Sequence, residues 1–152
     1  MKTIVSTLVL AAAMAGCAST DPTPLVVECK VAPVAGRSGP ALVGQAYGMA
    51  MTPLPLNSVQ FGSVALSRTV AVQNLYAQRT PADVVQISVR LVSCIDTPAA
   101  IRMRTTFLRA DTAPSESPSA WKVVYLQPRA TAQYAELSVS RDAASYLVEI
   151  AP

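Results

Sequence analysis

Histidine is absent from the 152 residues of this chain. Imidazole is the usual general base near neutral pH and a frequent ligand of zinc and haem iron, so histidine-based triads, zinc sites and haem ligation are excluded. Charged residues make up only 14% of the chain and aromatic residues 5%, whereas 51% are hydrophobic. A disordered chain carries more charge and less apolar surface. The sequence therefore predicts a folded protein, and its length suits one domain.

Two further absences narrow the function. No apolar run reaches the length of about 20 residues that an ordinary membrane-spanning helix needs. The glycines match neither of the phosphate-binding patterns, GxxxxGK[ST] and GxGxxG, so we expect no nucleotide loop. We also expect no metal, no catalytic residue and no cofactor, because the aspartates lie mainly in expected turns and the glutamates share no spacing that demands a common site.

The first 16 residues are typical of a secretory signal peptide: Lys2 precedes a stretch rich in Ile, Val, Leu, Ala and Met. They end in Met14-Ala15-Gly16-Cys17, which resembles the bacterial lipobox, where small residues precede a cysteine that receives lipid and becomes the mature N-terminus. We predict lipidation at Cys17. The alternatives are a plain signal peptide with an incidental cysteine and a short buried core helix.

Lipidation would place the domain on a membrane, because several acyl chains together anchor a protein far more firmly than one chain does. Ala18 and Ser19 follow the cysteine where, by resemblance to enterobacterial sorting, an aspartate would retain the protein in the inner membrane. We therefore expect attachment to the outer membrane with the domain facing the periplasm. Without Lys2 the side chains carry a small positive surplus, which suggests no nucleic-acid partner.

Cys29 and Cys94 are the two cysteines that remain, in a compartment that favours disulfides. A bond between them would close a long loop and stabilise the fold. Cys94, however, follows a segment whose odd-numbered residues are apolar, so its own side chain is expected to point outward. Two alternatives stay open, a disulfide and a pair of unpaired thiols.

Three regions follow from the composition: a signal peptide (1–16), a lipidated N-terminus with a tether and a Pro/Gly-rich linker (17–56), and a β-sandwich domain (57–152). Within the second region, 25–29 reads as an isolated strand and 41–51 as a broken helical turn. The linker is expected to pack on the domain or on a partner.

Residues 85–91 alternate aliphatic and polar side chains, and residues 101–107 repeat this pattern. Period-two alternation is typical of strands with one wet face. The turn at 94–98 makes these two strands a predicted antiparallel pair. With further strands expected at 63–73, 121–126, 132–140 and 145–150, the sequence predicts an all-β fold, a small antiparallel immunoglobulin-like sandwich.

Large aromatic side chains are expected to fill the space between the sheets: Phe107, Trp121, Tyr125 and Tyr146. The alternative for Trp121 is a ligand site. On the wet faces, Arg102 and Arg104 share a strand, and Arg90 is expected on the neighbouring one. Three adjacent guanidinium groups would form an anion-binding or interaction face. The alternative is an ordinary solvated strand face.

The run 69–74, the strand 85–91, the segment 107–111, Trp121 and the two closing strands resemble the YcfL family of periplasmic outer-membrane lipoproteins over residues 57–150. Asp111 and Trp121 match the family pattern, whereas Ser93-Cys94 replaces an asparagine and no glycine follows Asp111. The resemblance implies a small immunoglobulin-like domain of unknown function on a lipid anchor, with no established enzymatic activity. Members are often encoded near a lipoprotein that activates a peptidoglycan synthase.

These observations predict a non-enzymatic, lipid-anchored accessory module of the cell envelope that binds a periplasmic or outer-membrane protein, with a link to peptidoglycan synthesis. Strand addition at an exposed sheet edge is one plausible mode. The alternative is a structural lipoprotein subunit of an envelope-spanning assembly such as a secretion system.

Overall fold

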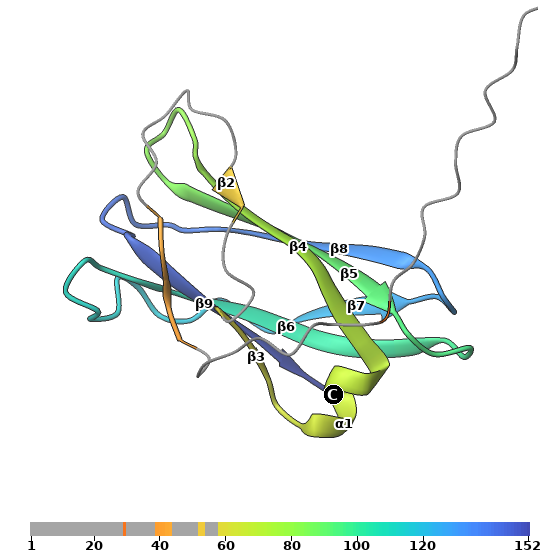
Figure 1. Ribbon diagram of the computed structural model, residues 1–152. Helices are drawn as coiled ribbons and strands as arrows, with labels where there is room; N and C mark the ends of the chain where they lie inside the picture. The colour runs from red at the N-terminus through yellow and green to blue at the C-terminus, as the bar shows by residue number, and fades with distance from the viewer. Residues whose placement is uncertain (1–28, 30–38, 44–51, 54–57) are drawn as a thin grey trace, which may run out of the picture.

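The computed structural model describes Cys29 and residues 39–43, 52–53 and 58–152. These residues form one short helix and nine strands. In chain order they are β1 (Ala41–Leu42), β2 (Thr52–Pro53), β3 (Val59–Phe61), α1 (Val64–Thr69), β4 (Val70–Arg79), β5 (Val85–Ser93), β6 (Ala99–Leu108), β7 (Lys122–Leu126), β8 (Thr131–Leu137) and β9 (Ser145–Ala151). The expected all-β sandwich is confirmed: two sheets face each other (Figure 1).

The first sheet has the order β1-β9-β6-β7, with β3 also pairing β9, and the second has the order β2-β4-β5-β8. All pairings are antiparallel except that of β3 with β9. Among the described strands the chain changes sheet at six connections: β1–β2, β2–β3, β3–β4, β5–β6, β7–β8 and β8–β9. Such crossings are the Greek-key connections of immunoglobulin-like sandwiches.

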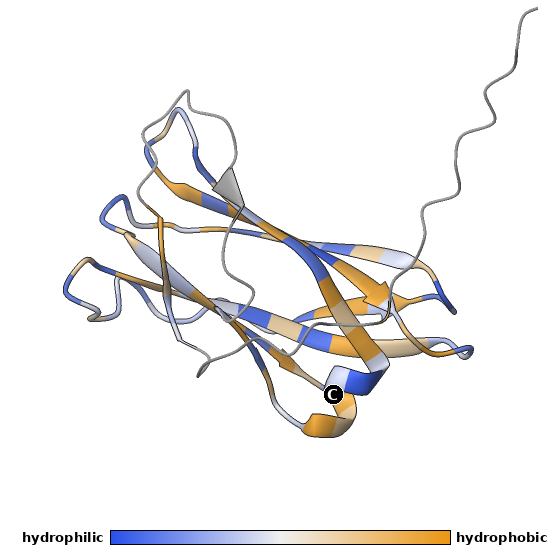
Figure 2. Cartoon of the chain, viewed as in Figure 1, coloured by the Kyte–Doolittle hydropathy of each residue, from blue (hydrophilic) through white to orange (hydrophobic). Residues whose placement is uncertain are grey.

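In β5 and β6, the side of the strand that carries the apolar residues of the alternating sequence is the buried side. In β6, Ile101, Met103 and Phe107 are buried, whereas Arg102 is exposed. Along β5 the odd-numbered aliphatic residues from Val85 to Leu91 are buried as well. Hydrophobic and hydrophilic residues therefore follow each other along these ribbons (Figure 2). Apolar faces of both sheets meet in one core.

The expected pairing of β5 with β6 is wrong. β5 lies between β4 and β8 in one sheet, and β6 lies between β9 and β7 in the other. Two stacked sheets are about 10 Å apart, and the connection over residues 94–98 is long enough to cross that gap. Each of the two strands has one apolar face. Because β5 and β6 lie in opposite sheets, both apolar faces are buried in the core between the sheets.

Two other expectations are corrected near the N-terminal side of the domain. Residues 63–73 do not form one strand: Ser63 caps a helical turn through a hydrogen bond from the Leu66 amide, and the strand begins only at Val70. Ala41–Leu42, expected in a broken helical turn, forms β1 beside β9. The expected strand at 25–29 falls, apart from Cys29, outside the described residues. Strands β1 and β2 show that parts of the predicted linker pack on the domain.

Buried tyrosines supply polar links inside the core. The Tyr134 hydroxyl on β8 donates to the Glu136 carboxylate and accepts a 3.0 Å hydrogen bond from the hydroxyl of Thr105 on β6, which joins the two sheets. Tyr146 on β9 bonds the hydroxyl of Ser58 at 2.9 Å. Burial raises the pKa of Tyr134 and of Tyr146 to about 12. The expected core positions of Phe107 and Tyr146 are confirmed.

These tyrosines predict a loss of stability in alkali. The unfolded chain releases a tyrosine proton near pH 10, whereas the folded chain holds it until about pH 12. The contribution of the two tyrosines to the free energy of unfolding is therefore fully present below pH 10, and it is lost as the pH rises toward 12. Tyr134→Phe should make the loss between pH 9 and 11 smaller by about 1 kcal/mol. Urea unfolding followed by circular dichroism at both pH values measures this, and an unchanged loss in the variant would contradict it.

Candidate functional site

The predicted lipid attachment site, Cys17, lies outside the described residues. Among those described, no helix is long and apolar enough to cross a membrane. No group of three or more cysteine, aspartate and glutamate side chains in the described part of the chain is placed to hold a metal ion.

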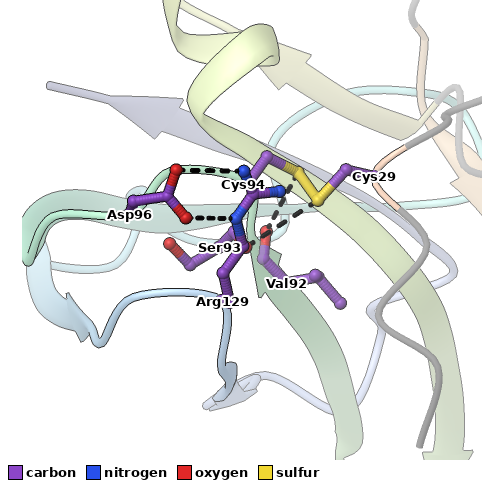
Figure 3. The surroundings of a disulfide bond; sticks show 6 residues. All are labelled: Cys29, Val92, Ser93, Cys94, Asp96 and Arg129. Atoms are coloured by element: carbon purple, nitrogen blue, oxygen red, sulfur yellow. Dashed lines mark hydrogen bonds and ion pairs between the residues drawn. A yellow bond between two sulfur atoms is a disulfide. The ribbon is translucent and has the colours of Figure 1, made fainter.

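A disulfide joins Cys29 to Cys94 at the end of β5 (Figure 3). The alternation that pointed Cys94 outward stops before it, because Leu91, Val92 and Ser93 are all buried in succession. The amide of Cys94 donates to the carbonyl oxygen of Thr69, which turns the chain away from β5. The bond attaches the chain N-terminal to the sandwich to one end of the domain.

A second contact holds the same end of the sandwich. Arg129, between β7 and β8, makes a two-pronged ion pair with Asp96, between β5 and β6, at 2.7 and 3.2 Å (Figure 3). The guanidinium lowers the pKa of the Asp96 carboxyl. The amide of Arg129 also donates to the Ile95 carbonyl oxygen. Two crossings between the sheets are thereby tied together beside the disulfide.

Arg102 and Arg104 lie together on the outer face of β6, as the alternation predicts. Arg104 makes a two-pronged ion pair, at 2.5 and 3.0 Å, with Glu149, which is directly opposite on β9. Arg102 donates from Nε to the Pro152 carbonyl oxygen at 2.8 Å. Both guanidinium groups also lie over the ring of Trp121, 4.5 Å from its centroid for Arg104 and 5.8 Å for Arg102.

The expected core positions of Trp121 and Tyr125 are wrong. Val123 lies opposite Arg102 in the β6–β7 pairing, and directly opposed residues share a face of the sheet. Trp121 and Tyr125, two positions away on either side, therefore lie outside, with 39% and 74% of their surface exposed. Leu126, on the other face, is the buried residue of β7. The face of Trp121, Val123 and Tyr125 is apolar throughout, whereas the other face begins with Lys122, so alternation favoured the wrong face.

The expected cluster of three arginines does not form. Arg90 lies on β5, on the outer face of the other sheet, beside Asn74 of β4 and Gln133 of β8. The error follows from the wrong pairing of β5 with β6. Two arginines and three apolar side chains remain together, and we call Arg102, Arg104, Trp121, Val123 and Tyr125 the Trp121 face.

The Trp121 face combines two cationic side chains on β6 with aromatic side chains at β7, the strand at the edge of the sheet. β7 is the last strand of the order β1-β9-β6-β7 and pairs only with β6 among the described strands. Val123 is 52% exposed beside the two aromatic rings. Sequence reasoning found the two arginines but missed Val123 and Tyr125 as surface residues, and it assigned Trp121 to the core.

Two solved structures share this fold. The crystal structure of Campylobacter jejuni Cj0090 is 14% identical with a TM-score of 0.53, over 62% of this chain and 98% of that one. A DUF1425 family member from Shewanella sp. PV-4 is 18% identical with a TM-score of 0.50, over 55% of this chain and 77% of that one. No family model and no curated protein matches the sequence. The likenesses establish the fold alone, and membership of the YcfL family stays a prediction.

Removing the disulfide should destabilise the domain. Cys29 and Cys94 are 65 positions apart, and closing such a loop restricts the unfolded chain by about 4 kcal/mol in the chain-entropy model. In a Cys17→Ser background, the further change Cys29→Ser/Cys94→Ser should lower the free energy of urea unfolding by an amount of that order. Dithiothreitol should lower it similarly in the parent and have no effect on the double variant. Equal stability of the parent with and without reductant would contradict the expectation.

Proposed function

We propose that this chain is a non-enzymatic, lipid-anchored accessory module of the bacterial cell envelope. Cys17 carries the lipid, the domain faces the periplasm from the outer membrane, and the Trp121 face binds a protein partner. The observation that carries the proposal is the position of Trp121: a partly exposed indole directly before an edge strand, with two guanidinium groups over its ring.

The composition of the Trp121 face supports a protein partner. Tryptophan, tyrosine and arginine are the residue types that contribute most to binding at protein interfaces. Tyr125 and Val123 leave apolar surface in water beside Trp121. Grouped apolar residues on a surface, rimmed by polar side chains, are typical of interaction sites.

The charges define the kind of partner. Glu149 is the acidic side chain that pairs with Arg104, whereas Arg102 donates to an oxygen of Pro152 and lies over the Trp121 ring. Two guanidinium groups thus lie beside the indole. An extended segment that carries a carboxylate and an apolar side chain would contact both the guanidinium groups and the aromatic rings while pairing its backbone with β7, as in strand addition.

The disulfide limits how far from the membrane the domain can bind such a partner. Cys17 and Cys29 are 12 positions apart, so a fully extended chain between them spans about 40 Å at most. Because Cys29 is bonded to the end of β5, this length is the greatest distance between the proposed lipid and the domain. The accessory module would therefore work close to its membrane.

Photocrosslinking in cells tests the proposal. A benzophenone amino acid in place of Tyr125 should form an adduct with one recurring envelope protein. Trp121→Ala should lower the yield about tenfold, as expected for a residue central to an interface. The matched control places the same probe at Val139, which is 87% exposed in the loop before β9 and outside the Trp121 face. Equal adducts from Val139, or a yield unaffected by Trp121→Ala, would contradict the proposal.

Two further readouts separate the alternatives. Cys17→Ser should release the protein from the membrane fraction and abolish the adduct if anchoring brings the partner within reach. The size of the solubilised complex separates an accessory module, in a small complex with part of its partner pool, from an assembly subunit, in a large particle of fixed composition. Retention of the Cys17→Ser protein on the membrane would contradict the lipid anchor.

A further inference from the structure

The outer face of the second sheet carries a hollow of about 540 Å³. It lies on the side of the sandwich away from the Trp121 face, because the two faces are the outer surfaces of opposite sheets (Figure 1). The residues that line it come from β4, β5 and β8: Asn74, Tyr76, Ser88, Arg90, Thr131, Ala132 and Gln133. Its size is within the range of small-molecule sites in proteins.

A β-bulge shapes this part of the sheet. The pairing of β4 with β5 shifts register between Val72 and Asn74, so the intervening residue has no partner. Bulges bend a strand and increase its local twist, and they recur where a side chain must be re-aimed. Beyond the bulge, Asn74, Arg90 and Gln133 lie side by side across three strands.

Arg90 has an uncompensated positive charge. Its partly buried side chain makes no hydrogen bond or ion pair with the described residues, and none of the seven lining residues is acidic. The two arginines of β6 differ, since Arg104 pairs with a carboxylate and Arg102 with an oxygen of Pro152. A guanidinium in this position matches a carboxylate, which it holds through two parallel hydrogen bonds.

The remaining lining groups favour hydroxyl and amide groups on the ligand. Asn74 and Gln133 carry side-chain amides, and Ser88, Thr131 and Tyr76 carry hydroxyls, so the hollow both donates and accepts hydrogen bonds. Gln133 donates to the Ser88 hydroxyl at 2.9 Å, which holds two of these side chains in place. The Tyr76 ring adds a flat apolar surface. This inventory matches a sugar ring better than a purely apolar molecule.

We propose that the hollow binds a saccharide that carries a carboxylate. Arg90 holds the carboxylate, and the amide and hydroxyl side chains around it bind the hydroxyl or acetamido groups of the ring. The site is independent of the Trp121 face, because it shares no residue or sheet with it. Failure of one proposal therefore leaves the other untouched.

Three sugars test the proposal with the full chain in detergent. N-acetylmuramic acid carries both a carboxylate and an acetamido group, glucuronic acid carries only the carboxylate, and N-acetylglucosamine carries only the acetamido group. Ligand-observed NMR should detect binding of an acidic sugar in the millimolar range, and N-acetylglucosamine should bind at least about tenfold more weakly. A preference for N-acetylmuramic acid points to a wall glycan as the source, and a preference for glucuronic acid to a uronic-acid polymer. Both results support the site.

Variants locate the site. Arg90→Gln should weaken binding of the acidic sugar at least about tenfold, and Arg90→Lys, which keeps the charge but not the two-pronged geometry, should be intermediate. Arg68→Gln removes an exposed charge of α1, outside the hollow, and should leave the affinity unchanged. Thermal unfolding checks that each variant is folded. Absence of binding by both acidic sugars, equal binding of N-acetylglucosamine, or an equal loss in Arg68→Gln would overturn the proposal.

Discussion

The burial of one face of every long strand is the constraint on which the rest of this structure depends. Side chains in a strand alternate between the two faces, so placing Ile101 and Phe107 in the core forces Arg102 and Arg104 outward. Pairing then transmits this choice to neighbouring strands: Glu149 on β9 and Val123 on β7 must lie on the same outer face as the arginines they oppose. The Trp121 face is thus a consequence of core burial.

The sequence predicted most of the sandwich where one face of a strand is apolar and the other polar. Strands β5, β6 and β9 meet this condition, and their positions and the burial of Phe107 and Tyr146 are confirmed. β7 does not, because both of its faces carry apolar residues and its charged residue, Lys122, lies on the same face as the buried Leu126. Only its pairing with β6 reveals that Trp121 and Tyr125 are outside, and pairing is a long-range property that local alternation does not contain.

Local alternation also could not predict that Arg90 lies apart from Arg102 and Arg104. Consecutive strands often pair, but β5 and β6 lie in different sheets. Arg90 is therefore on the outer surface of one sheet, and Arg102 and Arg104 are on the outer surface of the other. The disulfide was likewise left open, because the alternation of β5, when extended to Cys94, points that side chain outward, whereas in the structure the alternation stops at Leu91. Strands that are neighbours in the sequence are therefore a poor guide to shared surfaces in a sandwich whose described strands change sheet six times.

The disulfide attaches one end of the domain to the N-terminal chain, and this attachment limits the distance of both outer faces from the proposed lipid. The Cys29–Cys94 bond ties the N-terminal chain to the end of β5, close to the Asp96–Arg129 pair. Without this bond, the next attachment within the described residues is β1 at Ala41. Cys17 and Ala41 are twice as far apart in sequence as Cys17 and Cys29, so the bond about halves the maximal reach of a tethered domain. Oxidation thereby sets how far both faces extend from the membrane in the proposed function.

The central claim is that Trp121, directly before β7, and Tyr125, within β7, lie on the outside of the sandwich, where a partner can reach them. Hydroxyl-radical footprinting with mass spectrometry measures this directly on the purified, disulfide-bonded chain. Tyr125 and Tyr146 form a matched pair, since the residue type is the same and only their burial differs. The account predicts rapid oxidation of Tyr125 and Trp121 and protection of Tyr146. Protection of Tyr125 equal to that of Tyr146 would contradict it, because β7 would then face the core.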